Sequence, residues 1–454
     1  MRFPVFIAVA ACKATRLALR LTGRGGTALP GRVALKLRPG LLGELAKDVE
    51  VVAVTGTNGK TTSSRMLEQM YIDAGYDFFS NRSGANLASG ITAEFAANAT
   101  LSGKPKKKKA IIECDEGAMR VVAGQLAPKA IVVTNLFRDQ LDRYGEVTHT
   151  LESIREGVKK TPDSVLCLNA DCSLTASLAQ DTDNPIVFFG VNEPLTNVMS
   201  SVAEAPRCIR CGAEYSYEFH TYDHLGSFYC PKCGYRRHEP DIAVTHIVDM
   251  NESSSIADFS VYGKMAAASI ALPAAYNVYN AVGALAAAVT LGLDTEKALL
   301  SLGSVHSGFG RMETFDFNGA SVRMILVKNP AGMNQALSYL SHVPENAVAV
   351  LCLNDNIADG TDVSWIWDAD FESVFGTRKF GRLIVWGTRA EDMLLRLVYA
   401  GADESSVTVA ENVGALLDLI SGSEAPVYIL PNYTSMLELR DALAKRCGKR
   451  RFWE

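Results

Sequence analysis

The residues best suited to chemistry lie in the segment TGTNGKTT, residues 55–62. An apolar run precedes this segment and a helical pattern follows it, which is the context of a loop that binds phosphate. Its two glycines let backbone N–H groups turn toward an anion, and the N-terminus of the following helix adds positive charge. Lys60 can reach the β- and γ-phosphates of a nucleotide, and the hydroxyl of Thr61 or Thr62 can hold Mg²⁺.

Acidic side chains further along could bind the metal that accompanies a nucleotide. Glu113 ends an apolar run, and Asp115 and Glu116 follow it. Because open α/β sheets bind ligands at the carboxyl ends of their strands, Glu113 is well placed to reach a metal on a phosphate. The alternative interpretation is that these acids form a surface cluster that caps the next helix. This alternative has more weight for Asp115 and Glu116 than for Glu113. The segment TNLFRDQLD (134–142) follows the next apolar run in the same way.

Two CxxC pairs predict a metal site of a different kind. Cys208 and Cys211 are separated by 18 residues from Cys230 and Cys233. This is the spacing of a four-cysteine zinc ribbon. Four thiolates leave no open position on Zn²⁺, so the expected role is structural. Three nearby histidines are interpreted as solvated loop residues rather than ligands: His220, His224 and His238.

A dense group of acids marks the C-terminal part of the chain. Asp355, Asp359 and Asp362 lie in the segment LNDNIADGTDVSWIWD (353–368), directly after a β-rich run. Short carboxylates and two tryptophans after a strand indicate a site or a partner surface, and the alternative is a turn that caps a helix. No cysteine of the chain lies near a histidine in a motif typical of a nucleophile–base pair. If glutamine is the nitrogen donor, its hydrolysis therefore needs another polypeptide.

Short apolar runs that alternate with helical patterns must position these residues. Such runs lie at 51–54, 110–112, 130–133, 164–168 and 185–189, with a helical pattern at 61–74. This alternation is typical of a parallel, doubly wound α/β sheet. It stops at the cysteine-containing insertion and is expected to resume near Ile242, with a helix at 278–291. A second α/β block begins near Val322, with strands expected at 324–327, 347–353, 383–385 and 427–430.

Composition and charge exclude several classes of protein. The 454 residues are 48% hydrophobic and 21% charged, with a formal net charge of −5. The chain is therefore no disordered, collagen-like or coiled-coil protein, and its overall charge gives no reason to expect nucleic-acid binding. The first 40 residues differ, because they contain eight Lys or Arg and no acid. Residues 5–21 predict an amphipathic helix, most simply packed on the protein, while contact with an anionic membrane and a cleaved signal stay open.

Six segments, in the order typical of the family, resemble the Mur ligase superfamily, whose members build peptidoglycan stem peptides by activating a carboxylate as an acyl phosphate. They are GTNGKTT (56–62), Glu113, TNLFRDQLDRYG (134–145), LNADC (168–172), YNVYN (276–280) and GRME (310–313). The resemblance implies that ATP and Mg²⁺ are bound by Gly56, Thr57, Asn58, Gly59, Lys60, Thr61, Thr62, Glu113 and Asn135. It also implies that Asn277 and Asn280 lie near the adenine and that Arg311 reaches the nucleotide.

Three features depart from the Mur ligase pattern. Gln140 stands where the superfamily has a histidine that helps to hold a second metal. The segment ILVKNP (325–330) lacks the aspartate that binds ribose. A motif for an incoming amino acid is also absent. The residues for ATP are kept, whereas those for an amino-acid nucleophile are not found.

Almost the full chain is similar to the MurT family, the Mur-ligase-like subunits of lipid II isoglutaminyl synthase. Besides the four-cysteine insertion, the matching segments are NRSGAN (81–86), KNPAGMNQ (328–335), ADGTDVSWIWD (358–368) and LPNYT (430–434). The similarity implies ATP-dependent amidation of the D-glutamate α-carboxylate of the lipid II stem peptide to D-isoglutamine, with Mg²⁺ and structural Zn²⁺. It also implies a heterodimer with a GatD-like glutaminase, whose catalytic triad an aspartate of this chain completes. Asp355 is favoured and Asp362 comes next, while Asp359 is the third candidate.

Two other functions stay open. One is a self-sufficient amino-acid ligase of the Mur or folylpolyglutamate type, and the other is a regulatory ATP-binding scaffold. The expected domains are a basic helical segment (1–48), a central ATP-binding domain (49–312, with the ribbon at about 203–240) and a C-terminal α/β domain (313–454) that contacts the glutaminase. The expected location is the cytoplasm, and peripheral attachment to the inner face of the cell membrane stays open.

Overall fold

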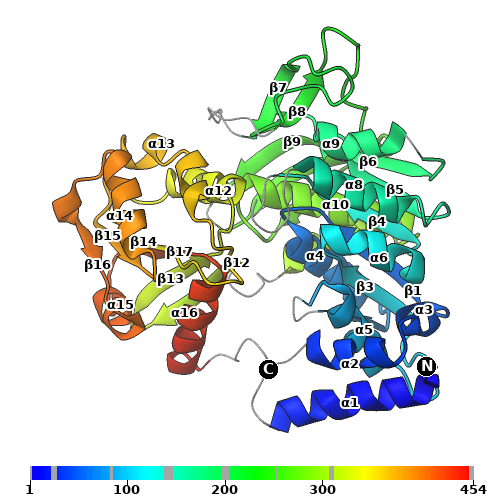
Figure 1. The fold of residues 1–454 in the computed structure, drawn as a ribbon. Helices are drawn as coiled ribbons and strands as arrows, with labels where there is room; N and C mark the ends of the chain where they lie inside the picture. The colour runs from blue at the N-terminus through cyan, green and yellow to red at the C-terminus, as the bar shows by residue number, and fades with distance from the viewer. Residues whose placement is uncertain are drawn as a thin grey trace. The chain divides into compact units, whose positions relative to one another are not determined.

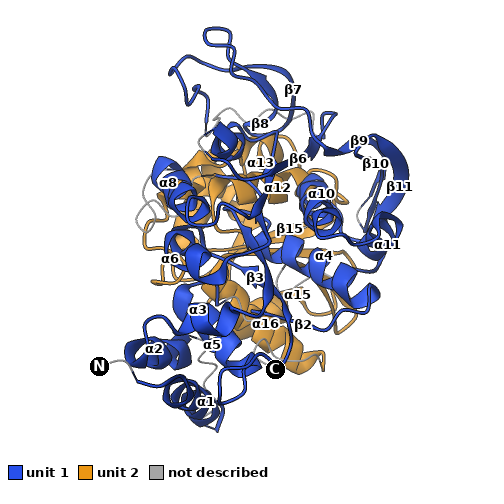
Figure 2. Ribbon diagram, turned by 90° about the vertical axis from the view of Figure 1, so that its right-hand side faces the viewer, with its two compact units in different colours: residues 1–136, 147–197, 205–305 blue, residues 137–146, 198–204, 306–454 orange. Residues whose placement is uncertain are grey.

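A computed structural model of the chain divides it into two compact units (Figure 2). It describes residues 3–21, 28–81, 85–137, 147–180, 182–195, 205–251, 253–305 and 311–448, apart from the side chain of Arg311. Unit 1 comprises Met1–Leu136, Val147–Asn197 and Ala205–Val305, and unit 2 comprises Phe137–Glu146, Val198–Glu204 and His306–Glu454.

A nine-stranded sheet forms the centre of unit 1, in the order β11-β10-β9-β6-β5-β4-β1-β3-β2 (Figure 1). Its strands are β1 (Glu50–Thr55), β2 (Phe78–Ser80), β3 (Lys109–Glu113), β4 (Ala130–Val133), β5 (Val165–Asn169), β6 (Ile186–Val191), β9 (Ile242–Met250), β10 (Ser255–Val261) and β11 (Lys264–Ile270). The pairs from β2 across to β9 are parallel. The predicted doubly wound core is confirmed, because helices cover both faces of these Val- and Ile-rich strands.

The prediction that strand–helix alternation resumes near Ile242 was wrong. The strands β9, β10 and β11 form an antiparallel meander there, and α10 follows it. In β10, Ile256 is 40% exposed whereas the neighbouring Ala257 is fully buried. This alternation is typical of a strand with one solvated face, so the sheet is mixed rather than parallel throughout.

Helices pack on the two faces of the sheet in unit 1 (Figure 2). Those described are α1 (Val5–Leu21), α2 (Ala28–Leu37), α3 (Leu41–Ala46), α4 (Lys60–Asp73), α5 (Ala88–Asn98), α6 (Glu116–Leu126), α8 (Val147–Val158), α9 (Ser173–Ala176), α10 (Ala275–Thr290) and α11 (Thr295–Ser301). Helices α4 and α10 pack together on one side, and α6 and α8 pack together on the other. The predicted N-terminal helix is α1, and it packs on α2 and α5.

The inserted module is a small two-stranded sheet with its own core. Strands β7 (Ser216–Tyr222) and β8 (Leu225–Tyr229) pair antiparallel between β6 and β9 in the sequence. Cys208 and Cys230 pack with Phe228 and Tyr235. Such a small hairpin buries too little apolar surface to be stable alone, so a cross-linking metal would stabilise it.

Unit 2 is a second α/β sheet, in the order β12-β13-β17-β14-β15-β16. Its strands are β12 (Arg311–Phe317), β13 (Ala320–Ile325), β14 (Val348–Cys352), β15 (Arg382–Trp386), β16 (Val407–Val409) and β17 (Val427–Pro431). Its helices are α12 (Pro330–Leu340), α13 (Glu372–Phe375), α14 (Ala390–Tyr399), α15 (Val413–Ile420) and α16 (Tyr433–Arg446). The four predicted strands correspond to β13, β14, β15 and β17, and Cys352 lies in the core as expected.

Candidate active site

The loop between β1 and α4 is held in a conformation that only glycine adopts easily. Gly56 has φ of +119° and Gly59 has φ of +87°. A Cβ atom at Gly59 would lie 2.0 Å from Oδ1 of Asn280, so a side chain has no room there. The loop therefore needs glycine both for its backbone angles and for the close approach of α10.

The segment after β4 holds this loop in place through hydrogen bonds. The N–H of Thr57 donates to the carbonyl of Asn135 at 2.9 Å. The N–H of Asn58 donates to Oδ1 of the same Asn135 at 2.9 Å, and Oγ1 of Thr134 donates to the carbonyl of Asn58 at 2.7 Å. The structure thus brings Asn135 against the loop, while Gln140 lies outside the described residues.

Lys60 is a buried cation surrounded by carboxylates. Its Nζ donates to the carbonyl of Gly56 at 2.5 Å and to Oε1 of Glu116 at 2.8 Å. Burial alone lowers the pKa of Lys60, but the charges of Glu116 and Glu113 outweigh this and raise the pKa above its usual value. Sequence reasoning treated Glu116 only as an acid in a local cluster. The structure makes it the direct ion-pair partner of the loop lysine.

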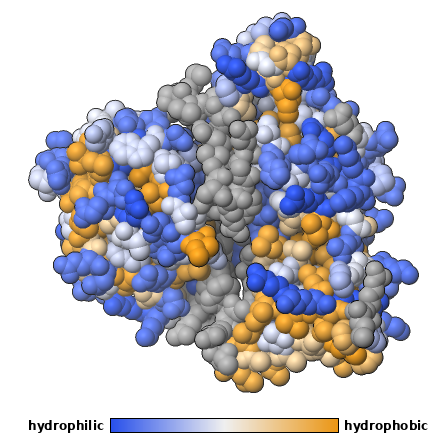
Figure 3. Space-filling view, viewed as in Figure 1, coloured by the Kyte–Doolittle hydropathy of each residue, from blue (hydrophilic) through white to orange (hydrophobic). Residues whose placement is uncertain are grey.

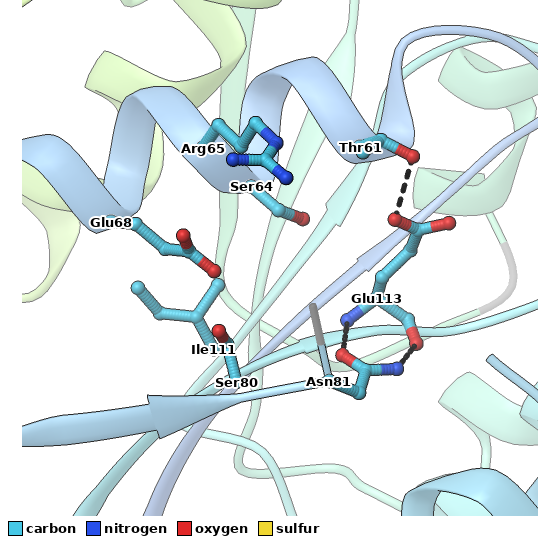
Figure 4. Close-up of a pocket in the computed structure, with 8 residues that line it drawn as sticks. All are labelled: Thr61, Ser64, Arg65, Glu68, Ser80, Asn81, Ile111 and Glu113. Carbon is cyan, nitrogen blue, oxygen red and sulfur yellow. Dashed lines mark hydrogen bonds between the residues drawn. The ribbon is translucent and has the colours of Figure 1, made fainter. Parts of the chain in front are cut away.

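Thr61 and Glu113 come together at the start of α4 (Figure 4). Oγ1 of Thr61 donates to Oε2 of Glu113 at 2.8 Å. Asn81 holds the backbone of Glu113 on both sides, because its Nδ2 donates to the carbonyl and its Oδ1 accepts the N–H. A hydroxyl and a carboxylate are ligands that suit Mg²⁺. The residues present therefore fit a nucleotide–magnesium site, while Asp115 serves as the N-cap of α6.

Figure 4 shows that the pocket beside Thr61 extends along α4. Its lining residues are Thr61, Ser64, Arg65, Glu68, Ser80, Asn81, Ile111 and Glu113. The pocket extends from the Thr61–Glu113 pair toward Ser80 at the end of β2.

The residues expected near the adenine lie on α10. Asn280 donates to Oδ1 of Asn277 at 3.0 Å, and Asn277 donates to the carbonyl of Pro273 at 2.5 Å. Oγ of Ser63 on α4 lies 3.4 Å from Oδ1 of Asn280. The contact with Ser63 joins α10 to the first turn of α4, directly after the loop. Thr62 is buried at the start of α4. Arg311 begins β12, and its side chain is not described.

The four cysteines of the insertion form one cluster. Their sulfur atoms all lie within 4.8 Å of one another, and the cluster comprises Cys208, Cys211, Cys230 and Cys233. This arrangement fits four thiolate ligands around a single metal ion. His238 is exposed and stacks on Phe188, with ring centroids 4.3 Å apart, so it is not part of the cluster.

The prediction that His224 is a solvated loop residue was wrong. Its ring is fully buried, with Nε2 3.5 Å from Sγ of Cys172 and Nδ1 3.2 Å from Oδ1 of Asp223. Burial lowers the pKa of His224, but its hydrogen bonds with Asp223 and Cys172 outweigh this and raise the pKa to about 10. Burial raises the pKa of the Cys172 thiol, but the hydrogen bond with His224, the charge of His224 and backbone hydrogen bonds together outweigh burial and lower the pKa below its usual value.

This contact brings together a cysteine and a histidine that form no sequence motif typical of a nucleophile–base pair. Cys172 and His224 are 52 residues apart in the chain, so no local motif joins them. Both side chains have a relative exposure of 0%. A glutamine side chain cannot reach the buried sulfur, so this pair joins the ribbon hairpin to the central sheet rather than offering an accessible nucleophile.

The three candidate aspartates of unit 2 have different environments. The side chain of Asp355 is 35% exposed, accepts from Oγ1 of Thr388 at 2.9 Å and lies 3.4 Å from the guanidinium of Arg389. Asp359 is 6% exposed and accepts from the N–H and the hydroxyl of Thr434 at 2.7 and 2.5 Å. Asp362 is exposed and accepts from the N–H of Ser364 at 2.8 Å. Hydrogen bonds from the hydroxyl and then the N–H of Ser364 lower the pKa of Asp362.

Large apolar side chains are exposed around these acids in unit 2. Trp367 is 46% exposed and packs edge-on against Tyr399, with ring centroids 5.4 Å apart. Ile357, between Asp355 and Asp359, is 90% exposed. Exposed aromatic and aliphatic side chains beside charged groups are typical of a protein interface.

Comparison with known proteins places the chain in a family. The Mur ligase middle domain model matches residues 54–220, and the MurT ligase C-terminal model matches residues 326–436. The chain is 34% identical over 451 residues to the MurT subunit of lipid II isoglutaminyl synthase (glutamine-hydrolyzing) from Streptococcus pneumoniae, covering 98% of each chain. This chain belongs to the MurT family. The MurT subunit from Staphylococcus aureus is 33% identical over 445 residues, or 96% of this chain and 97% of that one.

Solved structures share the Mur ligase fold with this MurT-family chain. A pseudomurein peptide ligase type C from Methanothermus fervidus superposes with a TM-score of 0.66 at 20% identity, over 87% of this chain and 79% of that one. MurF from Acinetobacter baumannii gives a TM-score of 0.64 at 16% identity, over 90% and 80%. The predicted fold class is therefore confirmed.

The two groups of candidate residues lie in regions that match different family models. The nucleotide loop lies within the region that matches the Mur ligase middle domain, which implies use of ATP. The three aspartates lie within the region that matches the MurT C-terminal domain. None of the helices in the described ranges is long and apolar enough to cross a membrane.

Proposed function

We propose that this chain amidates the α-carboxylate of D-glutamate in the lipid II stem peptide, forming D-isoglutamine during peptidoglycan biosynthesis. The observation that carries this proposal is the full-length similarity to MurT subunits of lipid II isoglutaminyl synthase. The Thr61–Glu113 pair and the buried Lys60 supply the residue types that ATP-dependent activation of a carboxylate needs. The chain is therefore a ligase subunit rather than an ATP-binding scaffold.

The proposed reaction has two steps. A carboxylate oxygen attacks the γ-phosphorus of ATP, the bond to the β-phosphate oxygen breaks, and ADP leaves. Ammonia then attacks the acyl carbon, phosphate leaves, and a proton is lost from nitrogen to give the amide. Lys60 would stabilise negative charge on the transferring group, and Thr61 and Glu113 would hold Mg²⁺. An ion held there would neutralise part of the negative charge of the nucleotide phosphates.

A glutaminase subunit, similar to GatD, would supply the ammonia. The name of the Streptococcus pneumoniae relative describes a subunit of a glutamine-hydrolyzing synthase. The exposed Trp367, Tyr399 and Ile357 offer a surface for such a subunit, and Asp355 lies beside Ile357 with an accessible carboxylate. Amidation of a lipid-linked substrate would bring the chain to the inner face of the cell membrane.

The direct test combines the chain with its glutaminase subunit, ATP, glutamine and lipid II. Mass spectrometry of the muropeptide should show replacement of a hydroxyl group by an amino group, with one ADP formed for each amide. Addition of a whole amino-acid residue would establish the alternative, a self-sufficient Mur- or folylpolyglutamate-type ligase. An unchanged muropeptide with both glutamine and ammonium would overturn the enzymatic function.

Zinc should be bound at the four-cysteine cluster. We expect about one zinc ion per chain by elemental analysis of the purified protein. The variant Cys211→Ser/Cys233→Ser should lose the metal and lower Tm by about 5–10 °C, because the β7–β8 hairpin has a small core. Cys352→Ser serves as a control, since it changes a buried cysteine of unit 2 outside the cluster and should keep the zinc. A full complement of zinc in the double variant would contradict the site.

The Cys172–His224 contact allows a test of whether glutamine is hydrolysed in this chain or in its partner subunit. In the complex, Cys172→Ser should leave glutamine-dependent and ammonium-dependent amidation changed by less than about twofold, because a buried sulfur cannot attack glutamine. The readout is the ratio of the two rates. A selective loss of the glutamine-dependent rate would move the glutaminase centre into this chain.

A further inference from the structure

Helix α1 carries a second apolar face that stays exposed among the residues that the structure describes. Its inner face buries Ala8, Val9 and Cys12 against α2 and α5. On the opposite side, Phe6 is 56% exposed, Leu17 is 59% exposed and Leu21 is 80% exposed. Positions 6, 10, 14, 17 and 21 are spaced by three or four residues, so one stripe along the helix is formed by Phe6, Ala10, Ala14, Leu17 and Leu21.

Basic side chains accompany this stripe. Arg20 is exposed on α1, and Arg32 and Lys36 are exposed one turn apart on α2, where Leu29 is 48% exposed on the same face. The sequence contains eight Lys or Arg before its first acid, Glu44. Figure 3 shows apolar residues gathered over α1 along the lower edge of unit 1, with hydrophilic residues next to them.

Two acids that contact this part of unit 1 are paired with arginines. Glu94 on α5 pairs with Arg16 at 3.0 Å, and Glu44 pairs with Arg38 at 2.9 Å. The remaining exposed cations Arg20, Arg32 and Lys36 give the surface a net positive charge.

The surface is also a preformed part of the fold. The guanidinium of Arg38 donates to the carbonyl of Phe3 at 2.7 Å, and the N–H of Phe3 donates to the carbonyl of Leu37. Lys13 donates to the carbonyl of Ala99, at the end of α5. The first two contacts join the start of α1 to the end of α2, and the third joins the middle of α1 to the end of α5, so the apolar stripe is presented on a packed support.

We propose that the exposed faces of α1 and α2 dock unit 1 on an anionic lipid bilayer. An apolar stripe flanked by Lys and Arg is the pattern of helices that lie in the membrane interface, with apolar side chains among the acyl chains and cations at the headgroups. A second copy of this chain fits less well, because its like charges would be brought together. The proposed docking surface consists of residues of α1 and α2. It would hold the proposed active site near a lipid-linked substrate.

The test measures binding of the full chain to vesicles that contain no lipid II, so it is independent of the amidation reaction. Sedimentation with vesicles of phosphatidylcholine containing phosphatidylglycerol should show binding that added salt weakens. Vesicles of phosphatidylcholine alone should bind about tenfold more weakly. The variants Leu17→Glu/Leu21→Glu and Arg20→Glu/Lys36→Glu should each weaken binding to the anionic vesicles at least about tenfold.

Leu300→Glu is the matched control, because Leu300 is 76% exposed on α11, away from α1 and α2 in the sequence. It should bind like the parent chain, and circular dichroism should show that all variants are folded. Unchanged vesicle binding in Leu17→Glu/Leu21→Glu would overturn the proposal. A concentration-dependent dimer that the same variant dissociates would overturn it too and would assign the face to a second copy of the chain.

Discussion

Replacing Lys60 with methionine is expected to reduce the ATP-dependent amidation rate by about 10²–10³-fold. The methionine side chain has a similar length but carries no charge, so negative charge on the transferring phosphoryl group loses its nearest cation. Lys60 lies in the loop that Gly56 and Gly59 shape, 2.5 Å from the carbonyl of Gly56. Its ammonium is thus held at the start of α4, where the N-terminus of the helix also favours an anion.

Folding complicates this experiment, and the structure shows how to control it. Lys60 and Glu116 are 9% and 7% exposed at their side chains, with Nζ and Oε1 2.8 Å apart. Removing Lys60 alone leaves a buried carboxylate without its ion-pair partner, which costs about 3–5 kcal/mol. The double variant Lys60→Met/Glu116→Gln removes both charges and should recover most of the lost Tm.

Comparison of the single and double variants separates chemistry from stability. If Lys60 acts on the nucleotide, the double variant regains stability but keeps the low rate measured as ADP formed with lipid II present. Recovery of the rate together with Tm would contradict a direct role and would leave Lys60 as a structural residue. The single variant Glu116→Gln, which keeps the ammonium, is expected to retain nucleotide binding by calorimetry.

Local patterns predicted the parts of the site that one stretch of chain builds. The nucleotide loop could be recognised because strand, glycines, lysine and helix follow one another within residues 50–73. The bounds of α1 were equally local, since an amphipathic period over 5–21 is set by the helix itself. The four-cysteine cluster was predictable because two CxxC pairs at this spacing are typical of a zinc ribbon.

Contacts between distant elements could not be predicted in this way. The Lys60–Glu116 pair joins residues 56 apart, and the Cys172–His224 contact joins the ribbon hairpin to the segment after β5. Both contacts depend on which strands are neighbours in the sheet. A local sequence pattern does not tell how far apart two distant segments lie in space. The antiparallel meander β9–β11 was not predicted for a related reason. Its strands are short β-rich runs like those before them, and the direction in which strands pair depends on the fold.

The three aspartates of unit 2 show the same limit and lead to the last prediction. The sequence favoured Asp355, then Asp362 and then Asp359, but it could not fix which of them acts. In the structure, Asp359 is 6% exposed and bonds with the first turn of α16 through Thr434, so it stabilises unit 2. Asp362 accepts from the N–H of Ser364, two residues away. Asp355 combines an accessible carboxylate with side chains that orient it.

Asp355→Asn is expected to reduce glutamine-dependent amidation by about 10²–10⁴-fold, as loss of a triad acid does. Ammonium-dependent amidation should be nearly unchanged, because the substitution leaves the nucleotide site intact. The measurement is the rate of amide formation with each nitrogen source, in the complex with the glutaminase subunit. Glutaminase activity of that subunit should fall in parallel.

Two neighbouring substitutions make the result specific. Asp362→Asn changes an exposed carboxylate bonded to the nearby N–H of Ser364, so it should alter either rate by less than about twofold. Asp359→Asn leaves a buried acceptor poorly paired, which costs about 1–3 kcal/mol, so it should lower Tm and reduce both rates together. Only a group that acts on the partner's chemistry separates glutamine from ammonium. If Asp362→Asn rather than Asp355→Asn separates them, the triad residue is Asp362; if no variant does, the partner needs no aspartate from this chain.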